Sequence, residues 1–180
     1  ARGAYVALHD SDDWWHPRHL ERHLAVMRRR PDLLLTSSAW VRMDETGFVA
    51  LKHNGGYLHF NPASTLFRAE VVEQIVFFDS IRIGADTEFI WHFRHRYGRR
   101  AEVELRQPLA IGRLHAASLT QSGVGAYNEH NVSPARLEYW ECWTRWHRRQ
   151  TQLGAPLRLE ASPPARPCER PFDAPEIILP

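Results

Sequence analysis

The sequence has little cysteine and no long apolar run, and each shortage excludes a class of protein. Its 180 residues include two cysteines, Cys142 and Cys168, which lie far apart and form no metal-ligand pair. Sparse cysteine favours a reducing compartment, so we expect a cytoplasmic protein, with contact at the inner face of a membrane as an open alternative. No stretch approaches the roughly 20 apolar residues of a membrane-spanning helix, and we expect no transmembrane segment.

Strong charge of one sign and phosphate-binding glycine loops are also missing. The formal net charge is +2, and the 24% of charged residues is ordinary for a globular chain. This mild balance argues against nucleic acid as a partner. Because no glycine-rich loop of the phosphate-cradling kind occurs, a metal-dependent phosphotransfer enzyme is a disfavoured alternative.

A signal peptide is absent from the N-terminal residues ARGAYVALHD, which lack its charged, apolar and cleavage regions. These residues have the pattern of a core strand with no lead-in. We therefore expect the sequence to be the second part of a larger domain.

Apolar periodicity and turn residues predict strands that alternate with helices. The expected strands span residues 4–8, 33–41, 48–51, 102–105 and 109–114. The expected helices span residues 17–30, 70–75, 86–97 and 134–153, with turns at 44–47, 54–56 and 61–62. This alternation predicts an α/β layered domain, in which ligands bind at the carboxyl ends of strands. Seven of the twelve prolines fall within residues 155–180, which predicts an extended or disordered tail.

Three carboxylates, Asp10, Asp12 and Asp13, follow the first expected strand within four residues. Carboxylates gathered at a strand end repel one another unless a cation neutralises them. Mg²⁺ and Mn²⁺ favour one or two carboxylates together with phosphate oxygens. A solvated turn, with one aspartate capping the next helix, explains the cluster equally well.

The residues around this cluster resemble a known family. GAYVALHDSDDWWHPRHLE is similar to the central motif of bacterial family 2 glycosyltransferases, which have the GT-A fold. The resemblance continues through SSAWVRMDETG, NPASTLFRAEVV and IGADTEFIWHFRHRYG to LHAASLTQSG, about residues 3–150. It implies a GT-A type mixed sheet flanked by helices and truncated at its N-terminus. Residues 1–154 are then the C-terminal, metal- and acceptor-binding part, and residues 155–180 the tail.

The resemblance also implies roles for single residues. Asp12, helped by Asp10, is expected to bind a Mn²⁺ or Mg²⁺ ion that bridges the donor diphosphate. Asp13 either belongs to the donor site or caps the following helix. His115 is similar to a family position at which a histidine or basic residue approaches the metal, although a loop histidine explains it as well.

Asp86 matches the family's second acidic motif and is the expected catalytic base. Ala85 stands before it where many members have glutamate, so a helper carboxylate is missing. The alternative is that Asp86 only caps the helix that it begins. Glu88 is the second candidate for the base.

Aromatic and histidine side chains lead to further expectations. One of Trp14 and Trp15 is expected to pack in the core and the other to line the donor or acceptor pocket. We expect surface positions for the helical histidines His16, His19, His23, His92 and His95. The tryptophan stripe of residues 140, 143 and 146 is expected to pack on the sheet, with docking of a partner or a membrane as the alternative.

Together with the resemblance, these features predict a metal-dependent glycosyltransferase of bacterial polysaccharide or glycan synthesis, and inversion at the anomeric carbon is implied by the resemblance alone. The expected donor is a nucleotide sugar, with a UDP-sugar first, and the expected acceptor is a glycan or a lipid-linked hydroxyl. The loop from His53 to Pro62 is expected to influence acceptor choice. The competing hypothesis is a non-catalytic, truncated relative that retains the fold as a binding module.

Overall fold

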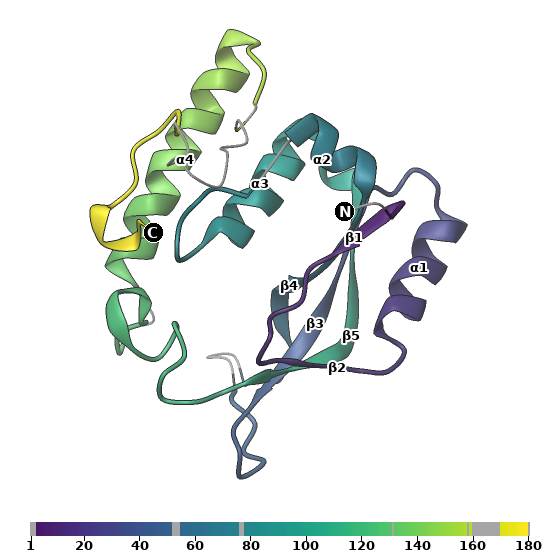
Figure 1. Cartoon of the computed structure of the whole chain (residues 1–180), viewed down its shortest axis with the longest axis vertical. Helices are drawn as coiled ribbons and strands as arrows, with labels where there is room; N and C mark the ends of the chain where they lie inside the picture. The colour runs from purple at the N-terminus through teal and green to yellow at the C-terminus, as the bar shows by residue number, and fades with distance from the viewer. Residues whose placement is uncertain are drawn as a thin grey trace. The chain divides into compact units, whose positions relative to one another are not determined.

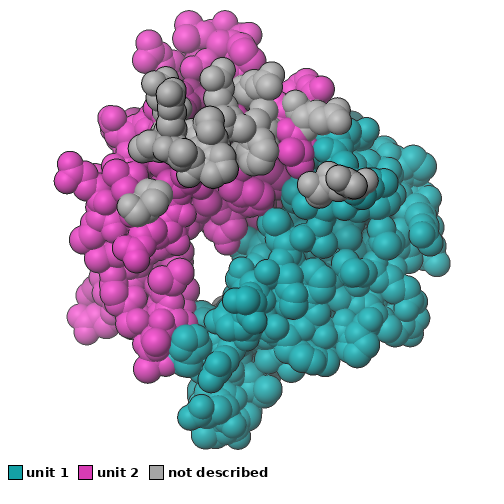
Figure 2. Space-filling view, viewed as in Figure 1, with its two compact units in different colours: residues 1–71, 97–115 teal, residues 72–96, 116–180 magenta. Residues whose placement is uncertain are grey.

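The computed structural model describes residues 3–51, 55–75, 78–130, 132–157, 159 and 170–179. These residues form two compact units, which Figure 2 colours separately. Unit 1 comprises residues 1–71 and 97–115, and unit 2 comprises residues 72–96 and 116–180. Each unit is described by itself.

Unit 1 is built on a mixed five-stranded sheet in the order β1-β4-β3-β5-β2 (Figure 1). Its strands are β1 (Tyr5–Ala7), β2 (Trp14–Trp15), β3 (Leu35–Met43), β4 (His59–Arg68) and β5 (Glu102–Arg113). The β3–β5 pair is parallel, whereas the other three pairs are antiparallel. The first strand was expected to lie in the core. It is instead an edge strand, antiparallel to β4.

Helix α1 (His19–Arg29) packs on this sheet. Its inner face carries Met27 together with His19 and His23, and all three are buried. The expectation of surface positions was therefore wrong for His19 and His23, while His16 is exposed. The two imidazoles are accommodated because His19 Nδ1 bonds the carbonyl of Leu109 at 3.0 Å and His23 Nδ1 bonds a threonine hydroxyl of β3 at 2.8 Å.

Predicted turns and strands differ from the structure in three places. The expected turn at Asn61–Pro62 lies inside β4, where the pairing with β3 shifts register. The side chain of Asn61 accepts a hydrogen bond from the amide of Ala63, so local turn chemistry persists as an irregularity within the strand. The two strands expected at 102–105 and 109–114 form the single strand β5, whose register shifts next to Pro108. The expected return strand at 48–51 is reduced to one bridge, between Met43 and Val49.

Unit 2 is helical, and its main helices match the predicted ones. They are α3 (Ala85–Tyr97) and α4 (Pro134–Leu153), with α2 (Ala69–Ile75) beginning in unit 1. Short 3₁₀ helices cover Gly123–Gly125 (η2) and Glu176–Ile178 (η3) in unit 2, and another covers Arg99–Ala101 (η1) in unit 1. Helix α4 begins at a proline, whose missing N–H is tolerated in a first turn, and ends before Gly154 in the left-handed conformation.

The core of unit 2 gathers around the tryptophans of α4. Trp143 packs with Tyr139 and Ile83, and Trp146 packs with Leu157 and Leu159. Burial in a core is thus confirmed for these two tryptophans, but the clusters around them consist of unit 2 residues and not of strands, and Trp140 is 41% exposed.

The described part of the proline-rich tail also packs on unit 2. Ile178 is fully buried in the cluster around Trp143, and Arg170 binds Asp79 at 2.7 Å. The prediction of an extended or disordered tail left this packing out. Cys168, His53 and Asn54 lie outside the described residues. Among the described helices, none has the length and apolar character needed to cross a bilayer.

Candidate functional site

The acidic turn, defined here as Asp10–Asp13, is held at one end of the sheet of unit 1. The amide of Asp13 bonds the carbonyl of Asp10 at 3.3 Å and closes the turn. Immediately afterwards Trp14 and Trp15 pair with Ile111 and Ala110 of β5. This two-residue strand fixes the turn beside the C-terminal end of β5.

The pairing with β5 brings together residues that lie about a hundred positions apart in the sequence. Asp13 Oδ1 accepts a hydrogen bond from the backbone amide of Arg113 at 3.1 Å. His115 Nε2 lies 3.5 Å from Asp12 Oδ2. The structure therefore places His115 at the acidic turn, as the resemblance implied, and it gives Asp13 a structural contact with β5.

The acidic turn concentrates negative charge. The pKa of Asp13 is raised to about 6, chiefly because the carboxyl is half-buried and further by the charges of Asp10 and Asp12. The hydrogen bond from Arg113 opposes this rise. A bound cation would relieve the same repulsion.

The donor set of the turn fits a hard or borderline divalent cation. The side chain of Asp12 is 50% exposed and that of His115 is 32% exposed, so their free lone pairs can reach an ion from solvent. Carboxylate oxygens suit Mg²⁺ and Mn²⁺, and an imidazole beside them suits Mn²⁺. Asp10 is exposed on the same turn and can add a second carboxylate.

The two tryptophans after the turn have different surroundings. Trp15 is stacked between His9 and His19, with ring centroids 4.1 and 3.9 Å away, and so takes the packing role expected for one of the pair. Trp14 is 51% exposed and meets only the edge of His16 among the described ring contacts. Its free face is therefore available for stacking on a sugar ring.

Sequence reasoning missed two residues that shape the turn. His9 Nε2 lies 3.2 Å from the carbonyl of Asp13, and Arg113 supplies the amide that binds the Asp13 carboxylate. A strand as short as β2 has no periodicity to predict it. In the sequence, the only sign that β5 ends beside the acidic turn was the similarity of His115 to a family position near the metal.

Asp86 and Glu88 lie in unit 2, in the first turn of α3. Asp86 is partly exposed, and its Oδ1 accepts hydrogen bonds from the amide of Thr87 at 2.7 Å and from the Thr87 hydroxyl at 3.3 Å. Glu88 is fully buried, and its Oε1 lies 2.9 Å from His147 Nε2. Of the two candidates for a base, Asp86 is the one that is exposed to solvent.

An aromatic pocket of about 320 Å³ lies in unit 2 at the start of α3, where Gly84 and Thr87 are part of its lining. Thr87, the residue that binds the Asp86 carboxylate, is part of its wall. The other lining residues are Gly84, Tyr127, Val132, Ser133, Arg136, Leu137, Tyr139, Trp140 and Trp143. Aromatic faces with one cation are a surface on which a sugar or another ring-shaped ligand can stack.

Comparison with known proteins identifies the first part of the chain. The family model described as Glycosyl transferase family 2 matches residues 1–100. The match covers more than half of the chain and includes the acidic turn and Asp86, whereas His115 lies beyond it. No curated protein is significantly similar to the chain. The mixed sheet flanked by helices is that of a GT-A-like fold.

Proposed function

Because the chain belongs to glycosyl transferase family 2, we propose that it transfers a sugar from a nucleotide-diphosphate donor, a UDP-sugar first, to a hydroxyl acceptor. The acceptor would be a glycan or a lipid-linked sugar in bacterial polysaccharide synthesis, and the transfer would invert the anomeric carbon. The observation that carries the proposal is the approach of His115 to Asp12 at the end of β5. It joins two potential metal ligands, one within the family match and one outside it.

The acidic turn is the proposed place of the donor diphosphate. Asp12 and His115 would hold a Mn²⁺ or Mg²⁺ ion, with Asp10 as the helper carboxylate. Such an ion supplies Lewis-acid stabilisation of the leaving phosphate oxygens. Asp13 would fix the turn through its bond to β5, while the exposed face of Trp14 would stack on the donor.

Asp86 is the proposed general base, which takes the proton of the acceptor hydroxyl as that oxygen forms the new glycosidic bond. Two features of unit 2 support this choice. The carboxylate is partly exposed, and Thr87 connects it to the wall of the aromatic pocket. We therefore propose this pocket as the acceptor side, in addition to the described residues 55–62, which lead into β4.

The proposal is tested by calorimetric titration of UDP, with and without Mn²⁺, into the wild type and into Asp12→Asn. We expect binding that requires Mn²⁺ and that weakens at least about tenfold in the variant. The fold should be unchanged, because the Asp12 side chain is half-exposed.

Asp32→Asn is the matched control, since Asp32 is an exposed aspartate of the same unit whose only described partner in a salt bridge is Arg30. It should bind UDP and Mn²⁺ like the wild type. Equal binding by Asp12→Asn would reject the metal assignment. A folded wild type that binds no UDP under any condition would favour the non-catalytic relative.

A further inference from the structure

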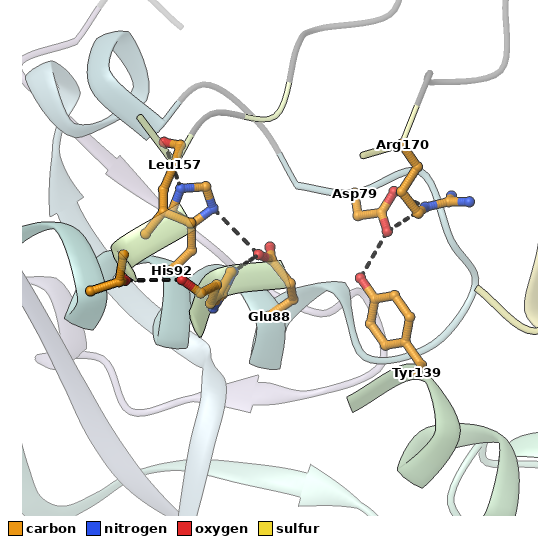
Figure 3. A network of polar contacts seen from close by, with 8 residues as sticks. Asp79, Glu88, His92, Tyr139, Leu157 and Arg170 are labelled. Carbon is orange, nitrogen blue, oxygen red and sulfur yellow. Dashed lines mark hydrogen bonds and ion pairs between the residues drawn. The ribbon is translucent and has the colours of Figure 1, made fainter. Parts of the chain in front are cut away.

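Unit 2 contains a second group of potential metal ligands, far more buried than the acidic turn. Glu88 and His92 lie four residues apart on one face of α3, and His147 projects from α4. The three side chains, called the buried triad below, are all 0% exposed. One ligand atom from each lies within 4.8 Å of the others. Figure 3 shows Glu88 and His92 pointing toward one another.

The protonation of His92 is restricted by its backbone partner. His92 Nε2 lies 2.9 Å from the carbonyl of Leu157, which only accepts hydrogen bonds, so Nε2 carries a proton (Figure 3). In the neutral ring Nδ1 is then a bare lone pair, and it faces Glu88 Oε1 at 3.3 Å. A lone pair against a carboxylate oxygen is repulsive unless a positive charge lies between them.

Protons alone do not satisfy the triad. Glu88 Oε2, His92 Nδ1 and His147 Nδ1 are buried side-chain atoms without a hydrogen-bond partner. A neutral imidazole and an ionised carboxylate are the forms that bind metals.

In another polar network of the same unit, the buried carboxylate has both hydrogen-bond donors and a counterion. Asp79 accepts hydrogen bonds from the Tyr139 hydroxyl at 2.8 Å and from Arg170 Nε at 2.7 Å (Figure 3). The guanidinium supplies the positive charge that balances this buried carboxylate. In the triad the carboxylate has no such cation among its described partners.

We propose that Glu88, His92 and His147 bind one Zn²⁺ ion through Glu88 Oε1, His92 Nδ1 and His147 Nε2, with Glu88 Oε2 as the fourth donor. Zinc binds imidazole nitrogen and carboxylate oxygen at about 2.1 Å, which puts neighbouring ligand atoms of a tetrahedral site about 3.4 Å apart. The two distances from Glu88 Oε1, 2.9 Å to His147 and 3.3 Å to His92, need only a small expansion, and the ligand atoms of the three residues all lie within 4.8 Å of one another. The two oxygens of Glu88 lie closer together than this spacing, because they belong to one carboxylate. The Leu157 carbonyl that orients His92 is the outer partner that metal-bound histidines ordinarily have.

The ion would connect the helix that carries Asp86 to the rest of unit 2. It would join α3 to α4, and through His92 to the chain at Leu157. This structural role is independent of the proposed function, since all three ligands are buried away from substrate. Zinc binding and UDP binding are therefore separate measurements with separate outcomes.

The test starts from the full chain, produced without a histidine tag and dialysed against excess Zn²⁺ and then against buffer. Metal analysis should find about one equivalent of zinc, and chelation should lower the melting temperature. His147→Gln should reduce bound zinc to less than about a tenth of an equivalent. His95→Gln is the matched control. His95 lies on α3, like Glu88 and His92, and its ring centroid is 5.0 Å from that of His147, but its side chain is exposed.

Replacement of zinc by Co²⁺ keeps the proposal testable if His147→Gln fails to fold. Four-coordinate Co²⁺ bound to nitrogen and oxygen absorbs strongly in the visible range, so the wild type alone gives a readout. His130→Gln, which changes a side chain 79% exposed in unit 2, should leave this absorption unchanged. A folded wild type with no zinc, no cobalt absorption and no response to chelators would overturn the proposal. Zinc that is lost in His115→Gln and retained in His147→Gln would assign the ion to the acidic turn instead.

Discussion

The carboxylate at the proposed donor site of unit 1 and two carboxylates of unit 2 differ in their exposure to solvent and in their partners. In unit 1, Asp12 is half-exposed and has one described ion-pair partner, His115, at 3.5 Å. In unit 2, the carboxylates of Asp79 and Glu88 are completely buried among partners at 2.7–2.9 Å. An exposed carboxylate retains lone pairs for a ligand from solvent, whereas a buried one must be balanced by a charge inside the protein, which is Arg170 for Asp79 and the proposed ion for Glu88.

This difference separates binding chemistry from structure. Substitutions at the acidic turn should change ligand binding and leave the free energy of unfolding nearly unchanged. Substitutions in the buried networks of unit 2 should do the reverse. Asp86 allows a test within one helix, because it is a partly exposed carboxylate on α3, which also carries the buried Glu88.

Asp86→Asn should have the largest effect on turnover. Loss of a general base lowers kcat by about 10²–10⁴-fold, while Mn²⁺-dependent UDP binding should remain, since Asp86 is not a ligand of the turn. The measurement is the rate of transfer or hydrolysis with a panel of UDP-sugars. Glu141→Gln, an exposed carboxylate of α4, is the control and should be neutral. Normal turnover in Asp86→Asn would remove it from the mechanism.

Asp79→Asn should produce the largest loss of stability. The change leaves the Arg170 guanidinium, whose side chain is 12% exposed, without its counterion, and breaking a buried pair costs about 3–5 kcal/mol. Chemical denaturation measures the free energy of unfolding. Asp32→Asn removes an exposed pair and should leave that free energy within experimental error. Equal losses in the two variants would show that burial does not distinguish these carboxylates.

The parts of the fold that could be predicted are those with a long repeating pattern. Helices α3 and α4 carry apolar stripes over several turns and end at glycines, so their bounds followed from the sequence to within a residue. Strand β2 has two residues and therefore no period. The Asn61–Pro62 pair was predicted to be a turn because these residue types favour turns. In the structure the pair lies within β4, where the pairing with β3 shifts its register.

The site could be predicted only where a family motif carried it. Asp12 and His115 were identified by resemblance, and the structure brings them together. The burial of His23 and His92 could not be foreseen, because polar residues are placed in a core by partners that lie elsewhere in the chain. For these two residues the partners are Thr36 of β3 and the carbonyl of Leu157. Neither partner is marked by spacing or composition.

Gly112→Ala should weaken unit 1 through crowding rather than backbone strain. A Cβ at this position would lie 2.4 Å from the ring of Trp40, and overpacking of this kind costs about 1–3 kcal/mol. Because Gly112 precedes the residue whose amide binds Asp13, Mn²⁺-dependent UDP binding should weaken as well. Gly47→Ala is the comparison: its φ of +87° costs about 1 kcal/mol, with no neighbour within 4 Å and no effect on UDP binding. Unchanged stability in Gly112→Ala would mean that Trp40 moves aside freely.

The buried His23 makes unit 1 sensitive to acid. Burial, and then the charge of His19, lower the pKa of His23 to about 3, whereas in the unfolded chain it is about 6.5. The unfolded state therefore binds a proton at higher pH than the folded state does. The stability that depends on neutral His23 is complete above about pH 6.5 and is lost as the pH falls toward 3.

His23→Gln should make this pH dependence shallower. Between pH 6 and 4 the free energy of unfolding of the wild type should fall by up to about 1.4 kcal/mol per pH unit through this one group, and the variant should lack that contribution. Urea denaturation at several pH values gives the slope. His130→Gln, a side chain 79% exposed in unit 2, should keep the wild-type slope. If both variants keep it, His23 is protonated in the folded protein, and the hydrogen bond to Thr36 is not what holds its imidazole neutral.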